Sequence, residues 1–244
     1  VTPVPTAKLD SLRRELTGAL ENLKSNEDLP LFRASSTESA LSSQAQRDPR
    51  FNDKWFRKWF QPKVLEDLIA IDLTIGQVMD ARLQDVARVA FSDILRKSSN
   101  AHSGYPNVMF DKNAPKRAKP VKPFLKALAR VCEMISSLEK ADAQWEGVRV
   151  DLGNATALPL EDCSVDAIVS HPPYIGSIPY AEYGALSLKW LGADPKELDK
   201  ELTGGRRQSL DVVERFRAGY DRMLLEASRV LRPGRHAFLM VGNP

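Results

Sequence analysis

The sequence predicts an α/β fold in which a mainly helical subdomain over residues 1–145 precedes an α/β portion over residues 146–244. Three observations indicate this division. In the first part, apolar residues recur every three or four positions, as in helices that bury one face. From Val148 onward, short apolar runs separated by loops replace that period. A further amphipathic stretch, Phe216–Leu231, then leads into a last apolar run. The domain boundary is therefore expected near residue 145.

Four amphipathic helices are expected in the first part, because the apolar residues of each share one helical face. The first helix spans Lys8–Lys24. The apolar positions of the four, in order, are Leu9, Leu12, Leu16, Leu20 and Leu23; Val64, Leu68, Ile71, Ile75, Val78 and Met79; Val86, Ala90, Ile94 and Leu95; and Phe124, Leu128, Val131, Ile135 and Leu138. Residues 33–50 are rich in Ser, Gln, Ala and Arg, show no period and are expected to form an exposed loop.

Residues 55–62 combine four aromatic side chains with two basic ones just before a proline. Two interpretations are open. The aromatic rings either anchor the helix that follows, or alternate with the bases to contact nucleic acid. Aromatic side chains more often serve packing, so the anchor is the favoured interpretation.

Residues 97–123 interrupt the helical period with basic residues and prolines. The bases are Lys112, Lys116, Arg117, Lys119 and Lys122, and the prolines are Pro115, Pro120 and Pro123. Bases on a proline-stiffened loop suit phosphate contacts, because each neutralised phosphate releases counterions. A plain solvated surface is the alternative. Lys116, Arg117 and Lys119 are the candidate nucleic-acid contacts here.

The stretch Val165–Tyr174 carries the strongest indication of chemistry. Its apolar run Ala167–Val169 predicts a buried strand. Pro172 and Pro173 follow and end the strand, because proline has no N–H to donate to a sheet ladder. Ligands of open α/β sheets bind beyond the carboxyl ends of the strands. His171 and Tyr174 are therefore expected at the active edge of the sheet.

This stretch resembles the motif of the amino-methyltransferases that use S-adenosylmethionine, which is (Asp/Asn/Ser)-Pro-Pro-Tyr at the end of their fourth strand. The first motif position is here His171, a departure from the family pattern. Residues 153–166, 175–192 and 216–241 also resemble the family. The resemblance implies a partial class I, Rossmann-like methyltransferase sheet with a helical insert or subdomain. It also implies DNA as the partner, with RNA as an alternative.

The family resemblance further implies methyl transfer to an exocyclic amino group of a DNA base. Its catalytic candidates are His171, Pro172, Pro173 and Tyr174. The Pro172 carbonyl and the His171 side chain would accept the N–H hydrogens of the amine and localise its lone pair. His171 can accept only as a neutral imidazole, through one nitrogen. Tyr174 would stack on the base, which must be rotated out of a duplex.

Asp151, Asn154 and Ala155 are the candidate cofactor-binding residues. In the family, the acidic residue after a glycine and the next backbone amide recognise the adenine of S-adenosylmethionine. Here Asn154 follows Gly153. An amide side chain can still accept from the adenine amino group and donate to a ring nitrogen. A simple polar turn is the alternative. Val148–Leu152, just before it, is expected to be a short strand.

Further candidate nucleic-acid contacts lie downstream. Tyr180 follows the motif on its loop, and Arg206 and Arg207 lie in a Gly-containing turn. Phosphate contact and plain surface are both open for the two arginines. Pro233-Gly234 is then expected to end a helix, and His236–Val241 to form the next strand. The apolar face of that helix comprises Phe216, Tyr220, Met223, Leu224, Ala227 and Leu231.

Two features of class I methyltransferases are not found in the 244 residues. One is the Gly-rich loop that holds the methionine end of the cofactor, and the other is the acidic residue that binds its ribose. The chain is therefore expected to be an internal portion of a methyltransferase or one half of a split enzyme. A second chain or an upstream segment would supply the loop. A circular permutation is the alternative.

Composition leaves the function class open. Lys and Arg total 35 against 32 Asp and Glu, and the mild net charge of +3 does not by itself indicate nucleic acid. Cys132 and Cys163 lack metal-ligand spacing and fit a reduced, cytoplasmic setting. No apolar stretch approaches the ~20 residues of a membrane span. Three functions remain: a DNA amino-methyltransferase, an RNA or protein-amide methyltransferase of the same fold, and a non-catalytic nucleic-acid-binding or partner subunit.

Overall fold

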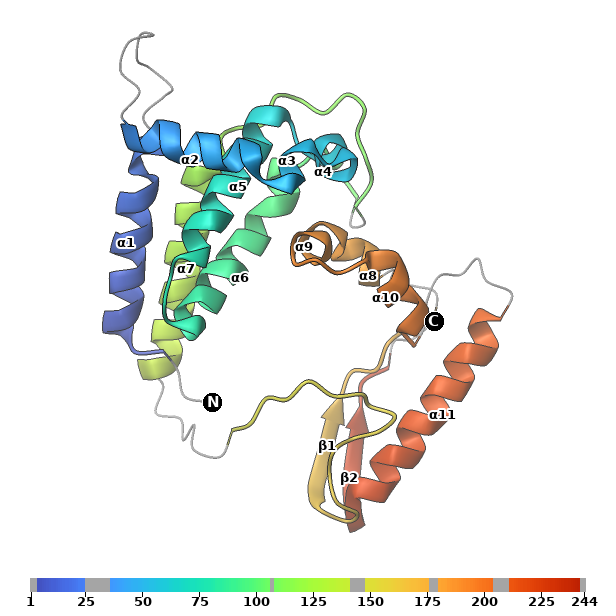
Figure 1. The fold of residues 1–244 in the computed structure, drawn as a ribbon. Helices are drawn as coiled ribbons and strands as arrows, with labels where there is room; N and C mark the ends of the chain where they lie inside the picture. The colour runs from blue at the N-terminus through green and yellow to red at the C-terminus, as the bar shows by residue number, and fades with distance from the viewer. Residues whose placement is uncertain are drawn as a thin grey trace. The chain divides into compact units, whose positions relative to one another are not determined.

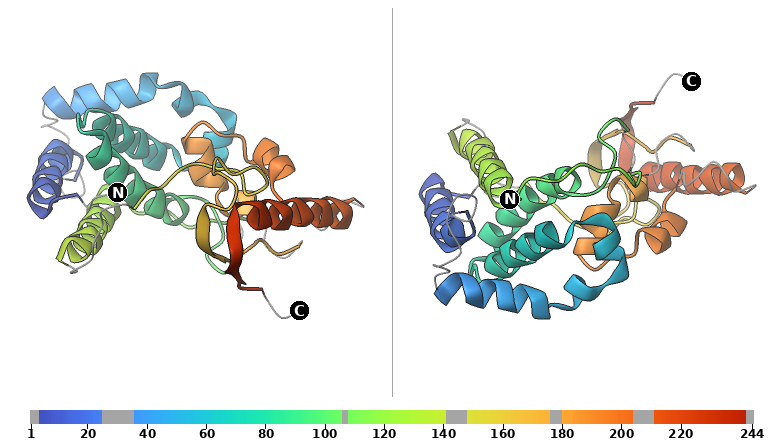
Figure 2. Two further views of the ribbon diagram at one scale, coloured as in Figure 1. Left: turned by 90° about the horizontal axis from the view of Figure 1, so that it is seen from below. Right: turned by 90° about the horizontal axis from the view of Figure 1, so that it is seen from above.

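The computed structural model describes residues 4–24, 36–105, 108–140, 148–175, 180–203 and 211–241. The chain forms two compact units, Val1–Val148 and Arg149–Pro244, drawn in Figures 1 and 2. The first unit is helical and the second combines helices with a parallel sheet, so the predicted α/β class is confirmed. The boundary expected near residue 145 lies outside the described residues.

Seven helices are described in the first unit. They are α1 (Thr6–Lys24), α2 (Ser36–Arg47), α3 (Pro49–Asn52), α4 (Lys54–Trp59), α5 (Pro62–Gly76), α6 (Ala81–Ser98) and α7 (Val121–Lys140). The four predicted amphipathic helices correspond to α1, α5, α6 and α7. Among the described residues, no helix has the length and apolar character needed to cross a membrane.

Helix α5 is the hydrophobic centre of this unit. It packs against α1, α2, α6 and α7, and α1 and α6 also pack against α7. Leu65, Leu68 and Ile69 of α5 are fully buried. Figure 1 shows α1 and α7 side by side, with α2 across one end of the bundle. Burying an apolar side chain contributes about 1.5–3 kcal/mol, so this helix supplies a large part of the unit's stability.

The prediction that Met79 belongs to the buried apolar face of helix α5 is wrong. Met79 is 98% exposed, although Val78 beside it is buried. Helix α5 ends at Gly76, and Asp80 already caps α6 through its side chain, which accepts from the N–H groups of Arg82 and Leu83. Residues between the two helices form a turn, so Met79 no longer follows the helical period.

The loop expected over residues 33–50 is also wrong, because α2 and α3 occupy most of it. Ala45 of α2 is fully buried, and Ser42 donates a hydrogen bond to Glu66 of α5. Ala, Gln and Arg favour helix, whereas small side chains give too weak an apolar period to be read from sequence. Pro49 begins α3, a position that proline tolerates well.

The second unit contains the parallel strands β1 (Val165–Ser170) and β2 (Leu231–Leu239). The helices between them are α8 (Tyr180–Tyr183), α9 (Ala185–Trp190), α10 (Pro195–Glu201) and α11 (Val212–Val230). The strand predicted around Ala167–Val169 is therefore confirmed, but its predicted burial is wrong, because Ala167 and Val169 are exposed and Ile168 is half-buried. Helix α11 leads directly into β2 and packs against it (Figure 1).

The start of β2 differs from the prediction. The helix ends at Val230 rather than at the Pro-Gly pair, and β2 begins at Leu231. Leu231 pairs with Val165 and His236 with Ala167, so residues 232–235 bulge opposite a single β1 residue. Gly234 adopts φ 76° there, a left-handed conformation that glycine reaches without steric cost.

The strand expected over Val148–Leu152 is not formed. Val150 is 77% exposed, and Arg149 pairs with Asp151 at 2.7 Å. The alternation of apolar and polar residues suits a strand, but β1 and β2 pair only with each other among the described residues. An alternating segment without a neighbouring strand has no ladder to join.

One face of the β1–β2 sheet is open. Val169 and Phe238 lie opposite each other in the ladder and are 83% and 61% exposed. Ile168 and Leu239 belong to the other face and are half-buried. Parallel sheets are normally covered on both faces. The open face of the described sheet is therefore unusual for this architecture.

Candidate active site at the end of β1

The His-Pro-Pro-Tyr segment directly follows the carboxyl end of β1. The ladder ends where the carbonyl of Ser170 accepts a hydrogen bond from the Met240 N–H at 2.9 Å. Pro172 is buried and Pro173 half-buried, whereas His171 is exposed. The two prolines have restricted φ and no N–H, which fixes where the chain leaves the sheet. The motif therefore begins at the sheet edge where α/β proteins bind ligands.

His171 and Tyr174 contact each other across this turn. The His171 Nε2 lies 2.5 Å from the Tyr174 hydroxyl oxygen. Their ring centroids are 5.2 Å apart, with an angle of 74° between the planes. The edge-to-face arrangement leaves the imidazole Nδ1 outside this hydrogen bond. Tyr174 is half-buried, so part of its side chain remains accessible.

Tyr180 is not brought into this pair. It is the first residue of α8, is exposed, and makes no described contact with His171 or Tyr174. Residues 176–179, which connect the motif to α8, are outside the described part of the chain. A contact of Tyr180 with nucleic acid therefore stays a prediction.

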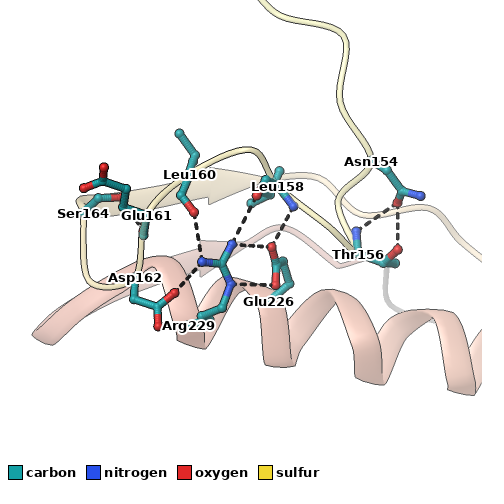
Figure 3. A network of polar contacts seen from close by, with 9 residues as sticks. All are labelled: Asn154, Thr156, Leu158, Leu160, Glu161, Asp162, Ser164, Glu226 and Arg229. Carbon is teal, nitrogen blue, oxygen red and sulfur yellow. Dashed lines mark hydrogen bonds and ion pairs between the residues drawn. The ribbon is translucent and has the colours of Figure 1, made fainter.

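The Asn154 side chain forms the hydrogen bonds of a local turn (Figure 3). Its Oδ1 accepts hydrogen bonds from the N–H and from the hydroxyl of Thr156, each at 2.9 Å. The Asn154 carbonyl accepts in addition from the Ala157 N–H. Both lone pairs of Oδ1 are thus occupied, and the side chain can offer only its NH₂ group to a ligand. The side chain therefore closes a polar turn in this structure, and adenine recognition by Asn154 stays a prediction.

The two other cofactor candidates are exposed. The Asp151 carboxylate pairs with Arg149, and Ala155 lies in the turn that Asn154 closes. The N–H of Ala155 forms no hydrogen bond with a described residue. Together with the Asn154 NH₂ group, it provides hydrogen-bond donors, whereas an adenine amino group needs an acceptor. The Asp151 carboxylate can accept, but its ion pair with Arg149 engages it.

Arg229 of α11 holds the loop between Asn154 and β1 in place (Figure 3). Its guanidinium donates to both carboxylate oxygens of Glu226, at 3.0 and 2.6 Å. It also donates to Asp162 Oδ1 at 2.5 Å and to the carbonyls of Leu160 and Leu158, at 2.9 and 3.1 Å. Sequence reasoning missed this network, although Glu and Arg three residues apart on one helix form a common pair.

Glu226 completes the network by accepting the N–H of Leu158 at 2.6 Å. The hydrogen bond from Arg229, and then the one from Leu158, lower the pKa of Glu226 to about 2. Arg229 fixes the conformation of the loop because it donates to two backbone carbonyls that take no part in a sheet ladder. The network therefore ties the Asn154 turn to the helix that precedes β2.

The basic candidates differ in their exposure and contacts. Lys116 is exposed. Arg117 is used internally, because its Nη2 donates to the Ala101 carbonyl at 3.0 Å. Lys119 is half-buried, and its charge opposes the rise in the pKa of Asp67 that burial causes. Arg206 and Arg207 lie outside the described residues, so their phosphate contacts stay a prediction.

Comparison with models of known protein families, with curated proteins and with solved structures found no match for this chain.

Proposed function

We propose that the chain is part of an S-adenosylmethionine-dependent methyltransferase that acts on an exocyclic amino group of a DNA base, adenine N6 or cytosine N4. One observation carries the proposal. His-Pro-Pro-Tyr directly follows β1, at the carboxyl edge of a parallel sheet. Ligands of open α/β sheets bind at that edge. We include in this proposal the class I, Rossmann-like sheet that the motif resemblance implies.

The motif residues would act on the target amine. Its lone pair is delocalised into the base ring, which makes it a poor nucleophile. The Pro172 carbonyl and His171 Nδ1 would each accept one N–H hydrogen and so localise the lone pair. Tyr174 would stack on the base, which is first rotated out of the duplex. S-adenosylmethionine, when bound, supplies the methyl group.

The described residues meet the needs of S-adenosylmethionine only in part. Asn154 and Ala155 offer donors, and Asn154 Oδ1 is occupied by Thr156. The methionine end would be held by a Gly-rich loop that we assign to a second chain or an upstream segment. The open sheet face beside Val169 and Phe238 supports this assignment, because a parallel sheet needs cover there. A cytoplasmic location is part of the proposal.

A second candidate function is favoured by the Asn154 turn. If Oδ1 stays bound to Thr156, the chain recognises adenine poorly and would serve as a non-catalytic nucleic-acid-binding or partner subunit. RNA or a protein amide as the methyl acceptor would leave the same fold and motif in place. The DNA, RNA and protein-amide alternatives differ in the acceptor that takes up the methyl group, whereas the non-catalytic subunit transfers none.

The test measures methyl transfer from isotopically labelled S-adenosylmethionine to duplex DNA, to RNA and to a Gln- and Asn-containing peptide. The chain is assayed alone and together with a polypeptide that carries the Gly-rich loop. We expect label on DNA amino groups, identified as the methylated nucleosides, and its loss in Tyr174→Ala. Label on RNA or peptide would move the function to those acceptors. Binding of DNA with no label on any acceptor would favour the non-catalytic function.

A further inference from the structure

The helical unit contains two segments in which basic residues are concentrated without acidic ones. Residues 54–61 and 112–122 together hold eight Lys and Arg and no Asp or Glu. The whole chain has nearly equal numbers of both, 35 against 32, so this separation is not its average composition. The eight bases are Lys54, Arg57, Lys58, Lys112, Lys116, Arg117, Lys119 and Lys122.

The Gln61 side chain joins the two segments because it both donates and accepts a hydrogen bond. Its Nε2 donates to the Pro115 carbonyl at 2.9 Å, and its Oε1 accepts from the Arg117 N–H at 3.2 Å. Gln61 lies two residues after the end of α4, so residues 112–122 are held close to the end of that helix. Its side chain makes no capping hydrogen bond to α5, for which Gln61 is the N-terminal cap residue.

Asn100 makes a second connection between α4 and the chain leading into the basic segment. Its N–H donates to the Trp59 carbonyl at 2.7 Å, and its Nδ2 donates to the Lys58 carbonyl at 3.1 Å. The Asn100 carbonyl accepts from the Asp111 N–H at 2.8 Å. Lys58 Nζ also lies 5.2 Å from the centre of the Phe110 ring. Figure 1 shows the connection from α6 to α7 passing α4.

Three of the four aromatic residues at positions 55–60 are buried, as the anchor interpretation expected, and Trp55 is half-buried. Phe56, Trp59 and Phe60 are buried, and the Trp59 ring meets Phe110 edge-on at 5.6 Å. The bases of α4 are exposed instead. A surface with buried rings and exposed cations can contact phosphates but offers few ring faces for base stacking.

Five of the exposed bases form no ion pair with a described residue. Arg117 and Lys119 are engaged by Ala101 and by the charge of Asp67, so the outward charge comes from the others. These five are Lys54, Arg57, Lys58, Lys112 and Lys116. Like charges held close together repel, and a polyanion relieves that repulsion.

We propose that α4 and residues 112–122 form one surface that binds the phosphate backbone of duplex DNA. Gln61 and Asn100 position its two parts. The choice of DNA rests on the proposed function, whereas the preference for a polyanion rests on the charges. Phosphate contacts fix orientation without reading sequence. The surface therefore supplies affinity, and target choice lies elsewhere.

The test uses the whole chain and a fluorescently labelled 20-base-pair duplex, without S-adenosylmethionine. Anisotropy titrations at several salt concentrations give the slope of log K against log salt. Arg57→Gln combined with Lys116→Gln should reduce that slope by about 2, because each lost phosphate contact removes ~0.9. The control is Arg13→Gln combined with Arg88→Gln, which removes equal charge where each arginine faces a carboxylate. It should keep the slope.

Gln61→Ala tests whether the two parts act as one surface. It changes no charge, yet it should weaken DNA binding because residues 112–122 lose their attachment to α4. Circular dichroism and thermal melting establish that each variant is folded at the assay temperature. Binding by Gln61→Ala equal to wild type would overturn the single surface. An unchanged slope in the Arg57 and Lys116 variant, or an equal loss in the control, would overturn the phosphate contacts.

The proposed function and this inference fail separately. DNA binding that depends on Arg57 and Lys116, with no methyl transfer to any acceptor, contradicts only the proposed function. Methyl transfer to DNA with binding independent of both residues contradicts only the surface. Tighter binding of a duplex RNA of equal length would overturn DNA as the ligand of this surface.

Discussion

The His171 Nε2 lies 2.5 Å from the Tyr174 hydroxyl oxygen, and this hydrogen bond restricts the chemistry open to the imidazole. If Nε2 accepts the hydroxyl proton, the neutral ring carries its own proton on Nδ1 and cannot accept from an amine. If Nε2–H donates to the hydroxyl oxygen, Nδ1 is an acceptor. The proposed methyl transfer requires the second arrangement.

Two substitutions of Tyr174 should separate its ring from its hydroxyl group. Tyr174→Ala removes base stacking and should cost roughly 1–3 kcal/mol of binding to the target base. Tyr174→Phe keeps the ring and removes the partner that orients His171, so its loss should be smaller. The measurement is kcat/KM for DNA in the complete enzyme. A Phe variant as impaired as the Ala variant would assign the role to the hydroxyl rather than to stacking.

The activity of the complete enzyme should fall at acid pH, because a protonated imidazole has no acceptor nitrogen. His171→Asn restores an acceptor of the family type and should keep activity while flattening the acid limb of the pH–rate profile. His236→Asn, at an exposed histidine of β2, is the matched control and should leave the limb unchanged. Identical profiles and full activity in wild type and His171→Asn would refute the role of His171.

Glu226 should make folding sensitive to strong acid. Its hydrogen bonds from Arg229 and Leu158 lower its pKa to about 2, below its ordinary value of 4.5. A lowered carboxyl pKa gives stability that is present above pH 4.5 and is lost as the pH falls towards 2. Glu226→Gln should therefore be less stable than wild type at pH 7, and the difference should shrink in acid.

The measurement for Glu226 is urea unfolding between pH 2 and pH 7. Asp221→Asn, at an exposed residue of the same helix, is the control and should give a difference near zero across the range. A Glu226→Gln variant as stable as wild type at pH 7 would mean that the network with Arg229 adds no stability.

The sequence predicted elements whose apolar residues keep a strong period. Leu9, Leu12 and Leu16 recur at helical spacing and are all buried in α1. Helix α2 was not predictable in the same way, because Ala45 is its only fully buried residue among those whose exposure is described. The strand predicted over Val148–Leu152 is not formed although its sequence pattern is clear. Its alternation suits a strand, but pairing depends on a neighbour that the alternation cannot reveal.

The candidate site was predictable in position and not in contacts. Pro172 and Pro173 fix the end of β1 by their own chemistry, so their placement followed from sequence. The bond between His171 and Tyr174 depends on two side-chain rotamers, which sequence does not determine. The hydrogen bond from Arg229 to the Leu158 carbonyl joins residues 71 positions apart, and only the fold brings them together.

Phe60 and Met79 should differ sharply in their effect on stability. Phe60 is fully buried and Met79 is 98% exposed, although both belong to apolar patterns in the sequence. Phe60→Ala should lower the free energy of unfolding by about 3–5 kcal/mol, because it leaves a cavity in the core. Met79→Ala should change it by less than about 0.5 kcal/mol. Urea unfolding measures both, and equal effects would contradict the exposure of Met79.

Asp67 should make the helical unit more stable in mild acid than at neutral pH. Its side chain is almost fully buried, and its Oδ2 has no hydrogen-bond partner among the described residues. Burial is the main cause that raises its pKa from 3.8 to about 6, against the attraction of Lys63 and Lys119. Glu66 beside it raises the pKa further.

The sign of the effect follows from this raised pKa. A carboxyl group whose pKa is higher in the folded state stabilises that state below about pH 4, and the stabilisation is lost as the pH rises through about 6. The difference of about two pKa units corresponds to at most ~3 kcal/mol. Asp67→Asn removes the charge at every pH. It should match wild type near pH 4 and be more stable at pH 7–8.

Urea unfolding of both proteins from pH 4 to pH 8 checks this expectation, because other titrating groups cancel in the difference between them. Asp85→Asn, at an exposed residue of α6, is the control and should give a difference that does not vary with pH. A constant difference between Asp67→Asn and wild type would mean that Asp67 titrates equally in the folded and unfolded chain. The buried carboxylate would then be compensated by Lys63, whose Nζ lies 3.7 Å from Oδ1.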